Sequence, residues 1–283
     1  MPFTPMAELL LAARDGGYAV PAFCVWNAET AEMVLQVTAR MQAPVILLHG
    51  PGEASLFPFA TMSRIVQLFL RDHHLPVAIC LDHGGDMAQV ADALDAGYSA
   101  VMLDYSARPY AENAAALRDV VALARPRGVT VEGEIGHVGR VDKVVTEGVH
   151  ESTLTDPAEA AAYVAETGID ALAVSIGNGH GLYTKLPRLD FDRLAEIAKT
   201  VTVPLVLHGG SGTPDADLKR AIGLGITKVN VASDLIAAVR NSLMRQWSEE
   251  RNLWAPMAMR EAVLAMAPVV EGWLIRTGAA GRA

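Results

Sequence analysis

Short runs of apolar and β-branched residues alternate along the chain with longer, alanine-rich segments in which apolar positions recur every three or four residues. Eight such runs predict strands, and each ends near Gly, His, Asp or Asn: residues 19–27, 44–50, 77–84, 99–106, 129–136, 171–181, 204–212 and 226–233. The segment after each run predicts a helix. Because parallel neighbours cannot be joined by a tight turn, strands separated by helices predict a parallel sheet.

Local signals mark the ends of several predicted helices. Asn27 and Asp156 precede first turns that their side chains can cap, and Thr213 precedes a proline at the start of another helix. Gly168 and Gly225 stand where helices are expected to stop.

Eight strand–helix units in succession predict a single (β/α)8 TIM barrel over residues 1–283, with an extra C-terminal helix from about Pro256 to Thr277. The alternative is a doubly wound open sheet, but its glycine fingerprint is missing after the first strand, where residues 25–30 read VWNAET. The stretch from Gly136 to Thr155 is too long and polar for an ordinary connection, so we predict a mobile active-site loop there.

Composition narrows the possible functions. Apolar residues make up 51% of the chain and charged residues 19%, so it can bury a large core and is not disordered. The net charge of −9 argues against a nucleic-acid or anionic-membrane partner. Cys24 and Cys80, the only cysteines, exclude a disulfide framework, and no leader-like or 18-residue apolar segment occurs. We therefore expect a soluble, cytoplasmic protein.

Three histidines stand at the ends of predicted strands. His83, His180 and His208 each precede a glycine, and in a parallel barrel these strand ends meet on the face where barrel enzymes place their chemistry. Three imidazoles suit a catalytic zinc ion, which leaves a fourth position for water or substrate. The alternative for each is a hydrogen-bonded residue at a strand end. His49 repeats the pattern without an adjacent carboxylate, so we expect a structural role for it, with a metal ligand or substrate contact as the alternative.

Three carboxylates accompany these histidines. Asp82 precedes His83, and a carboxylate beside a metal-activated substrate can move a proton, so Asp82 is a candidate general acid or base. Successive strand residues point in opposite directions, so the two side chains share a site only if the strand ends in a turn there. Asp104 and Glu134 would either bind a second or displaced metal ion or hydrogen-bond a ligand histidine.

Two segments predict an anion site. Residues 208–212 read HGGSG and residues 230–233 read NVAS, and each precedes a predicted helix. In barrels, the loops after the seventh and eighth strands bind phosphate through free backbone N–H groups at a helix start. Ser211 and Ser233 would add hydroxyl donors.

The motifs LDHG, VEGEIG, GNGHGLY, LHGGSG and KVNVASDL together resemble those of the class II, zinc-dependent ketose-bisphosphate aldolases, especially the tagatose-bisphosphate and fructose-bisphosphate branch. The resemblance spans nearly the whole chain. It implies a (β/α)8 barrel and reversible aldol cleavage of tagatose or fructose 1,6-bisphosphate to dihydroxyacetone phosphate and an aldehyde. It also implies a homodimer or homotetramer.

The resemblance also assigns roles to single residues. It gives three zinc ligands and one proton donor, in this order: His83, His180, His208 and Asp82. Asp104 and Glu134 match positions that hold a second or displaced metal ion. The cradle for dihydroxyacetone phosphate, sometimes aided by sodium or potassium, matches these residues: Gly181, Gly209, Gly210, Ser211, Asn230, Val231, Ala232 and Ser233.

The sequence departs from the family's pattern in three places. Residues 139–143 read GRVDK where relatives commonly carry a GGEED-like run, so Asp142 is the expected second catalytic acid. Gly50 stands where a hydroxyl residue is usual, and Tyr105 and Arg108 replace smaller or less charged residues. These departures concern the substrate, so a deoxy, sulfo or inositol-derived ketose phosphate is an alternative.

Three other functions fit parts of the sequence. A Schiff-base aldolase needs a lysine near the barrel mouth, and Lys228, the only lysine in a predicted strand, stands before the strand end. A metal-dependent hydrolase or epimerase would use the same zinc barrel. A sugar-phosphate-binding subunit without catalysis would keep the phosphate cradle, although a complete set of metal ligands argues against it.

Overall fold

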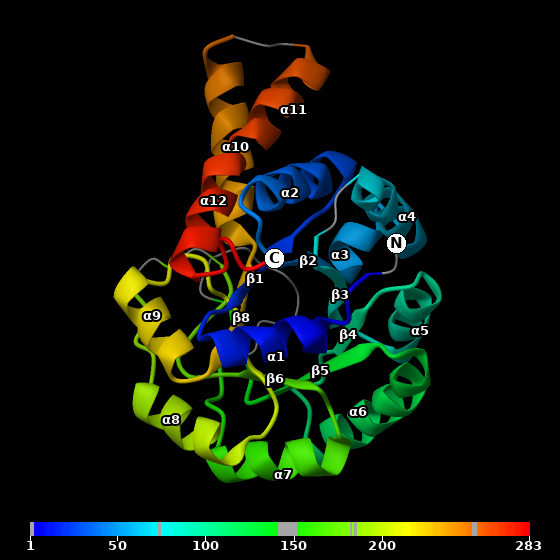
Figure 1. The fold of residues 1–283 in the computed structure, drawn as a ribbon, viewed down its shortest axis with the longest axis vertical. Helices are drawn as coiled ribbons and strands as arrows, with labels where there is room; N and C mark the ends of the chain where they lie inside the picture. Colours follow the sequence, from blue (N-terminus) through cyan, green and yellow to red (C-terminus); the bar gives the residue numbers. More distant parts are fainter. Residues whose placement is uncertain (1–2, 73–74, 141–151, 182, 184–185, 251–253) are drawn as a thin grey trace.

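The fold is a closed parallel barrel. The computed structural model describes residues 3–72, 75–140, 152–181, 183, 186–250 and 254–283. In this part of the chain, eight parallel strands close in chain order, with helices around them (Figure 1). The strands are β1 (Val20–Cys24), β2 (Val45–His49), β3 (Val77–Gly84), β4 (Ala100–Leu103), β5 (Thr130–Ile135), β6 (Ala171–Val174), β7 (Leu205–Leu207) and β8 (Ile226–Val231). Each begins within one residue of its predicted start, and the predicted (β/α)8 barrel is confirmed.

A layer of helices covers the outside of the strands. The helices between strands are α2 (Ala28–Arg40), α3 (Pro51–Ala54), α4 (Phe59–Phe69), α5 (Met87–Asp95), α6 (Tyr110–Ala124), α7 (Pro157–Thr167), α8 (Phe191–Thr200) and α9 (Asp215–Gly223). Short 3-10 turns follow α4 and α6: η1 (Leu70–Asp72) and η2 (Arg125–Arg127). The short helix α3 was not expected from the sequence, and it places Glu53 beside the cavity described below.

One helix closes the end of the barrel opposite that cavity. Helix α1 (Met6–Gly16) lies across the strands in Figure 1 and precedes β1. The N–H of Ala7 donates to Oγ1 of Thr130, the first residue of β5, at 2.9 Å, so α1 sits at the N-terminal end of the strands. The C-terminal strand ends are therefore the ones left for a site.

Most of the predicted helix ends are correct. Asn27 and Asp156 cap α2 and α7 by accepting hydrogen bonds from first-turn N–H groups, and Gly168 ends α7 at a φ of 70°. Thr213, however, does not cap α9, and its buried hydroxyl has no hydrogen-bond partner among the described residues. The reason is that α9 begins one residue later than predicted, with Pro214 at the N-cap position, and Thr213 belongs to the turn after β7, where its N–H donates to the carbonyl of Gly210.

The C-terminal region differs from the prediction of one extra helix. After α10 (Ser233–Ser248), which extends away from the barrel in Figure 1, two helices follow: α11 (Ala255–Leu264) and α12 (Ala267–Arg276). Pro268 explains the break, because proline has no N–H and is tolerated only in the first turn of a helix. Among the described residues, no helix is long and apolar enough to cross a membrane.

Every strand residue is buried except Asp82 and His83 of β3, which are half-buried. Burial on both faces is normal for a parallel sheet covered by helices. Among the described strands, the only partly exposed residues are thus two predicted site residues.

Candidate active site

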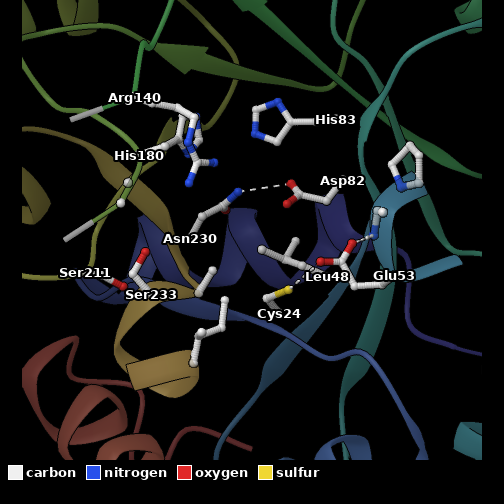
Figure 2. Close-up of a pocket in the computed structure, with 17 residues that line it drawn as sticks. Cys24, Leu48, Glu53, Asp82, His83, Arg140, His180, Ser211, Asn230 and Ser233 are labelled. Carbon is white, nitrogen blue, oxygen red and sulfur yellow. Dashed lines mark hydrogen bonds between the residues drawn. The ribbon is translucent and has the colours of Figure 1, made fainter. Parts of the chain in front are cut away.

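A cavity of about 310 Å³ opens at the C-terminal ends of the strands (Figure 2). Most of the predicted site residues line it: Asp82, His83, His180, Gly181, Gly209, Ser211, Asn230, Ala232 and Ser233. Residues far apart in the chain meet here. Asn230 Nδ2, for example, donates to Oδ1 of Asp82, 148 positions away, at 3.2 Å.

The end of β3 brings Asp82 and His83 to the same cavity. His83 has a φ of 50°, in the left-handed region that non-glycine residues rarely adopt. The pairing of β3 with β4 also shifts register between Leu81 and Gly84. The strand alternation therefore breaks at the point where the sequence interpretation required a turn. Such strain is typical of functional sites.

The three predicted ligand histidines form one cluster. The ring centroid of His83 lies 4.9 Å from that of His180 and 4.8 Å from that of His208. One nitrogen from each ring lies within 4.8 Å of the others. These rings are close enough to share one ion.

In two of these rings, one nitrogen contacts a carboxylate. His83 Nδ1 lies 2.7 Å from Asp104 Oδ2, and His208 Nε2 lies 2.8 Å from Glu132 Oε1. The other nitrogen of His83, Nε2, is buried and has no hydrogen-bond partner in the described part of the chain. The other nitrogen of His208, Nδ1, lies 3.0 Å from Glu134 Oε2, so His83 is the ring that shows the following pattern. A carboxylate on one nitrogen and a lone pair on the other is the usual arrangement of a metal-ligating histidine.

Asp104 and Glu134 lie beside the histidine cluster, and together with His83 they form a second candidate metal group. Asp104 also accepts hydrogen bonds from Ser106 Oγ at 2.7 Å and Ser106 N at 3.1 Å. Oε2 of Glu134 lies 3.0 Å from His208 Nδ1 and has no hydrogen-bond partner among the described residues. Asp104 therefore contacts a histidine of the cluster and also belongs to a candidate metal group, so both of its predicted roles remain predictions.

The charges of this cluster favour a cation. Burial disfavours the charged form of His83, but the carboxylates of Asp82 and Asp104 outweigh it and raise the pKa of His83 to about 10. Burial also lowers the pKa of His180 well below its usual value, and the neighbouring His83 and His208 lower it further. The three rings therefore do not all take protons. A divalent ion would supply the positive charge while leaving the imidazoles neutral, so these residues fit a metal ion.

Lys228 and Glu132 form a buried ion pair behind His208. Lys228 Nζ lies 2.8 Å from Oε2 and 3.1 Å from Oε1 of Glu132, and both side chains are fully buried. Burial favours neutral Lys228, but the adjacent Glu132 carboxylate outweighs it and raises the lysine pKa. A lysine held as ammonium is not a nucleophile, and Lys228 does not line the cavity, which argues against the Schiff-base alternative.

The loops after β6, β7 and β8, which carry the residues predicted to bind an anion, meet at one wall of the cavity. Gly209 has a φ of 61°, and a Cβ there would lie 2.0 Å from the carbonyl oxygen of Gly179, so only glycine lets these two loops approach. Ser211 Oγ accepts from the N–H of Asp234 at 3.2 Å. Ser233 starts the 16-residue helix α10 at the cavity wall, and the positive end of a helix dipole favours an anion there.

Two predicted substrate-binding residues do not line the cavity. The N–H of Gly210 donates to the carbonyl of Asn230 at 2.9 Å and is not available to a ligand. Val231 is fully buried in β8. Both lie behind the cavity wall.

Two cavity residues, Cys24 and Glu53, were not predicted. Cys24 Sγ donates to Glu53 Oε1 at 3.5 Å, and the N–H of Gly50 donates to Glu53 Oε2 at 3.2 Å. A Cβ on Gly50 would lie 2.8 Å from the carbonyl oxygen of Asp82, which explains why a hydroxyl residue does not fit there. The one available signal was the glutamate three residues after Gly50, where a carboxylate can cap a first turn.

Arg140 is a further cavity residue without a predicted role. Its backbone pairs with that of His180, and Figure 2 shows its side chain on the histidine side of the cavity. Asp142, the predicted second acid, lies outside the described residues. The guanidinium carbon of Arg108 lies 4.0 Å from the ring centroid of Tyr105, and neither residue lines the cavity.

His49 packs away from the cavity. It is fully buried, its Nδ1 lies 2.7 Å from the hydroxyl of Tyr98, and its ring meets Phe59 edge to face at 5.5 Å. Burial lowers the pKa of His49 to about 4. This environment fits the structural role expected for it.

Comparison with known proteins gives one consistent result. The family model described as fructose-bisphosphate aldolase class-II matches residues 4–282. The YdjI aldolase of Escherichia coli K12 is 31% identical, with a TM-score of 0.87 and 99% of each chain covered. A proposed fructose-1,6-bisphosphate aldolase of Coccidioides immitis is 29% identical, with a TM-score of 0.87 over 99% of this chain and 98% of that one. The fructose-bisphosphate aldolase Fba of Campylobacter jejuni shares the fold at 20% identity, with a TM-score of 0.82 over 98% and 95%.

Proposed function

Because the chain belongs to the class II fructose-bisphosphate aldolase family and is an aldolase, we propose that it uses zinc to cleave a phosphorylated ketose reversibly into dihydroxyacetone phosphate and an aldehyde. The observation that carries this proposal is the convergence of three histidine rings beside the cavity, with ring nitrogens within 4.8 Å of one another and a buried His83 Nε2 that has no hydrogen-bond partner among the described residues. The motif resemblance names tagatose and fructose 1,6-bisphosphate as the first substrates to test.

His83, His180 and His208 would hold the zinc ion. Zinc bound there would act as a Lewis acid on the ketone and hydroxyl oxygens of dihydroxyacetone phosphate and so stabilise the negative charge that develops on carbon. The backs of two rings are held by Asp104 and Glu132, which orient the ligand nitrogens. Asp104 and Glu134, together with His83, would hold a second or displaced divalent ion.

Asp82 would move the proton of the hydroxyl group at the bond being broken. In cleavage, its carboxylate takes the proton from the C4 hydroxyl as that oxygen becomes the aldehyde oxygen, and in synthesis it returns the proton. Asn230, which donates to Asp82 at 3.2 Å, would orient the carboxylate. We assign the second proton transfer, at carbon, to Asp142.

The loops after β6, β7 and β8 would bind the phosphate of the substrate. Gly181, Gly209, Ser211 and Ser233 line that side of the cavity at the start of α10. Their N–H and hydroxyl groups would fix the dihydroxyacetone half in place. A sodium or potassium ion beside the phosphate, as in some relatives, belongs to the same proposal.

We also propose that residues 1–283 form one aldolase domain and that the protein is a cytoplasmic homodimer or homotetramer. Both cysteines are unpaired buried thiols, which suits a reducing compartment. Light scattering on the purified protein measures the assembly.

The test is a substrate panel with metal control. We expect the zinc-loaded protein to release dihydroxyacetone phosphate from at least one ketose 1-phosphate or 1,6-bisphosphate, and full chelation to abolish that activity. Release of inorganic phosphate instead would indicate a hydrolase. Binding without turnover would indicate a sugar-phosphate-binding subunit, and activity that survives complete metal removal would contradict the zinc proposal.

A further inference from the structure

The two sides of the cavity differ in charge. In Figure 2, Ser211 and Ser233 lie at the left of the cavity, on the Asn230 end of the Asp82–Asn230 hydrogen bond. Glu53 lies at the right, beyond Asp82, and Cys24 lies between Glu53 and the serines. The serine side carries the start of α10 and favours an anion. The other side adds a second carboxylate, that of Glu53, to the carboxylate of Asp82.

The position of Asp82 fixes where each half of a substrate lies. With the phosphate of the dihydroxyacetone half in the cradle, the C4 hydroxyl meets Asp82, which takes its proton. The carbons beyond C4 then extend away from the cradle. The side of the cavity available to them in Figure 2 is the one formed by Cys24 and Glu53.

No described lysine or arginine lies on that side of the cavity wall. Arg140 is the one lysine or arginine among the described lining residues, and its backbone pairs with that of His180 on the opposite side. Cys24 is a neutral thiol there, because burial and the neighbouring carboxylates of Glu53 and Asp82 raise its pKa well above the usual value, and so it supplies no counter-charge. A phosphate on the aldehyde half carries between one and two negative charges at neutral pH and would face Glu53 without a counter-charge.

We propose that Glu53 makes this aldolase selective for ketose 1-phosphates whose aldehyde half carries no phosphate. The inference rests on the proposed aldol function and names the substrate class of that site. The carboxylate of Glu53 accepts hydrogen bonds from sugar hydroxyls and repels a second phosphate, so discrimination comes from an unfavourable contact with the bisphosphate.

Glu53 also caps the short helix α3 through its bond from the Gly50 N–H. That bond does not need a negative charge, since the side-chain oxygen of glutamine accepts it as well. Glu53→Gln therefore removes the negative charge while keeping the hydrogen bond that caps α3. Glu29→Gln is the matched control, because Glu29 is exposed at the start of α2, at the same end of the barrel but outside the cavity wall.

The experiment follows aldol synthesis from dihydroxyacetone phosphate with two acceptors, D-glyceraldehyde and D-glyceraldehyde 3-phosphate, which differ only in the phosphate. We expect kcat/KM of the zinc-loaded wild type to be at least tenfold higher for glyceraldehyde. Glu53→Gln should lower that preference at least tenfold, and Glu29→Gln should leave it unchanged. Zinc content and Tm of each variant show that the fold is intact.

Two results would overturn the inference: a wild-type preference for the phosphorylated acceptor, or an unchanged ratio in folded Glu53→Gln. If the variant does not fold, the ratio of the wild-type kcat/KM values for the two acceptors still tests the inference. Deuterium exchange at the hydroxymethyl carbon of dihydroxyacetone phosphate, followed by NMR, tests the proposed function separately. If the protein catalyses deuterium exchange but prefers the phosphorylated acceptor, only this inference fails and the proposed function stands. If the protein gives no exchange and forms no aldol product, the proposed function is wrong and this inference fails with it.

Discussion

Replacement of Lys228 by methionine tests the buried support of the metal site. Methionine fills a similar volume but leaves Glu132 as a carboxylate with no ammonium partner, at a position that is fully buried. Burial favours the neutral acid, but Lys228 and His208 outweigh it and lower the pKa of Glu132 to about 2. Without Lys228, the negative charge of Glu132 is only partly compensated.

The magnitude follows from the burial of the pair. Removing one partner of a buried ion pair costs about 3–5 kcal/mol. Unfolding entropy is about 2.1 cal/mol/K per residue, or about 0.6 kcal/mol/K for a chain of this length, so Tm should fall by about 5–8 °C. Loss of support behind a ligand histidine should also weaken zinc binding by about 10–100-fold.

Thermal unfolding with and without chelator separates the two effects, and chelator competition measures zinc affinity. Arg127→Met is the control, because Arg127 pairs with Asp95 at 2.7 Å on the surface, where both side chains are at least 46% exposed. That loss should cost less than about 1 kcal/mol, or about 2 °C. The double variant Lys228→Met/Glu132→Gln should recover most of the lost stability, since it leaves no buried charge unpaired.

Two outcomes would refute this reasoning. If Tm of metal-free Lys228→Met falls no further than that of Arg127→Met, the ion pair does not stabilise the barrel as its burial implies. If zinc affinity is unchanged, Glu132 does not need Lys228 to orient His208.

Three further predictions concern single side chains. His180→Ala should lose bound zinc and most activity, measured together by metal analysis and rate; full zinc content would remove His180 from the ligand set. Asp82→Ala should keep its zinc while kcat falls about 100-fold or more, and loss of the metal would contradict its role as a proton carrier. The pKa of buried His49 is about 4, below the ordinary 6.5. Between these pH values the unfolded state binds more protons than the folded state. The free energy of unfolding therefore falls as pH decreases from 6.5 to 4, by up to about 3 kcal/mol. Urea unfolding at pH 7 and pH 4.5 should show a smaller loss for His49→Gln than for the wild type, and equal losses would contradict this origin.

The barrel and the histidine cluster were predictable because their signals are local. Strand starts follow from apolar runs, and the order of strands in a parallel barrel places His83, His180 and His208 at one end of it. This inference needs only the topology. The distances between the rings are a property of the fold, and the sequence interpretation did not contain them.

Other features depend on contacts across the barrel. Lys228 and Glu132 are 96 positions apart, and nothing in either strand's pattern shows that they pair. The cavity position of Glu53 depends on the approach of Gly50 to the backbone of Asp82, which is a contact between neighbouring strands. Thr213 resembled a helix cap because a proline and a helical pattern follow it. In the structure it lies in the turn after β7, where its N–H donates to the carbonyl of Gly210, and α9 begins one residue later than predicted.

The most direct test of the account is anomalous scattering at the zinc absorption edge from crystals of the zinc-loaded protein. We predict one strong peak about 2.0–2.1 Å from His83 Nε2, His208 Nδ1 and a ring nitrogen of His180. An active, zinc-loaded enzyme with its metal elsewhere, and with these three rings bound to no ion, would contradict the account.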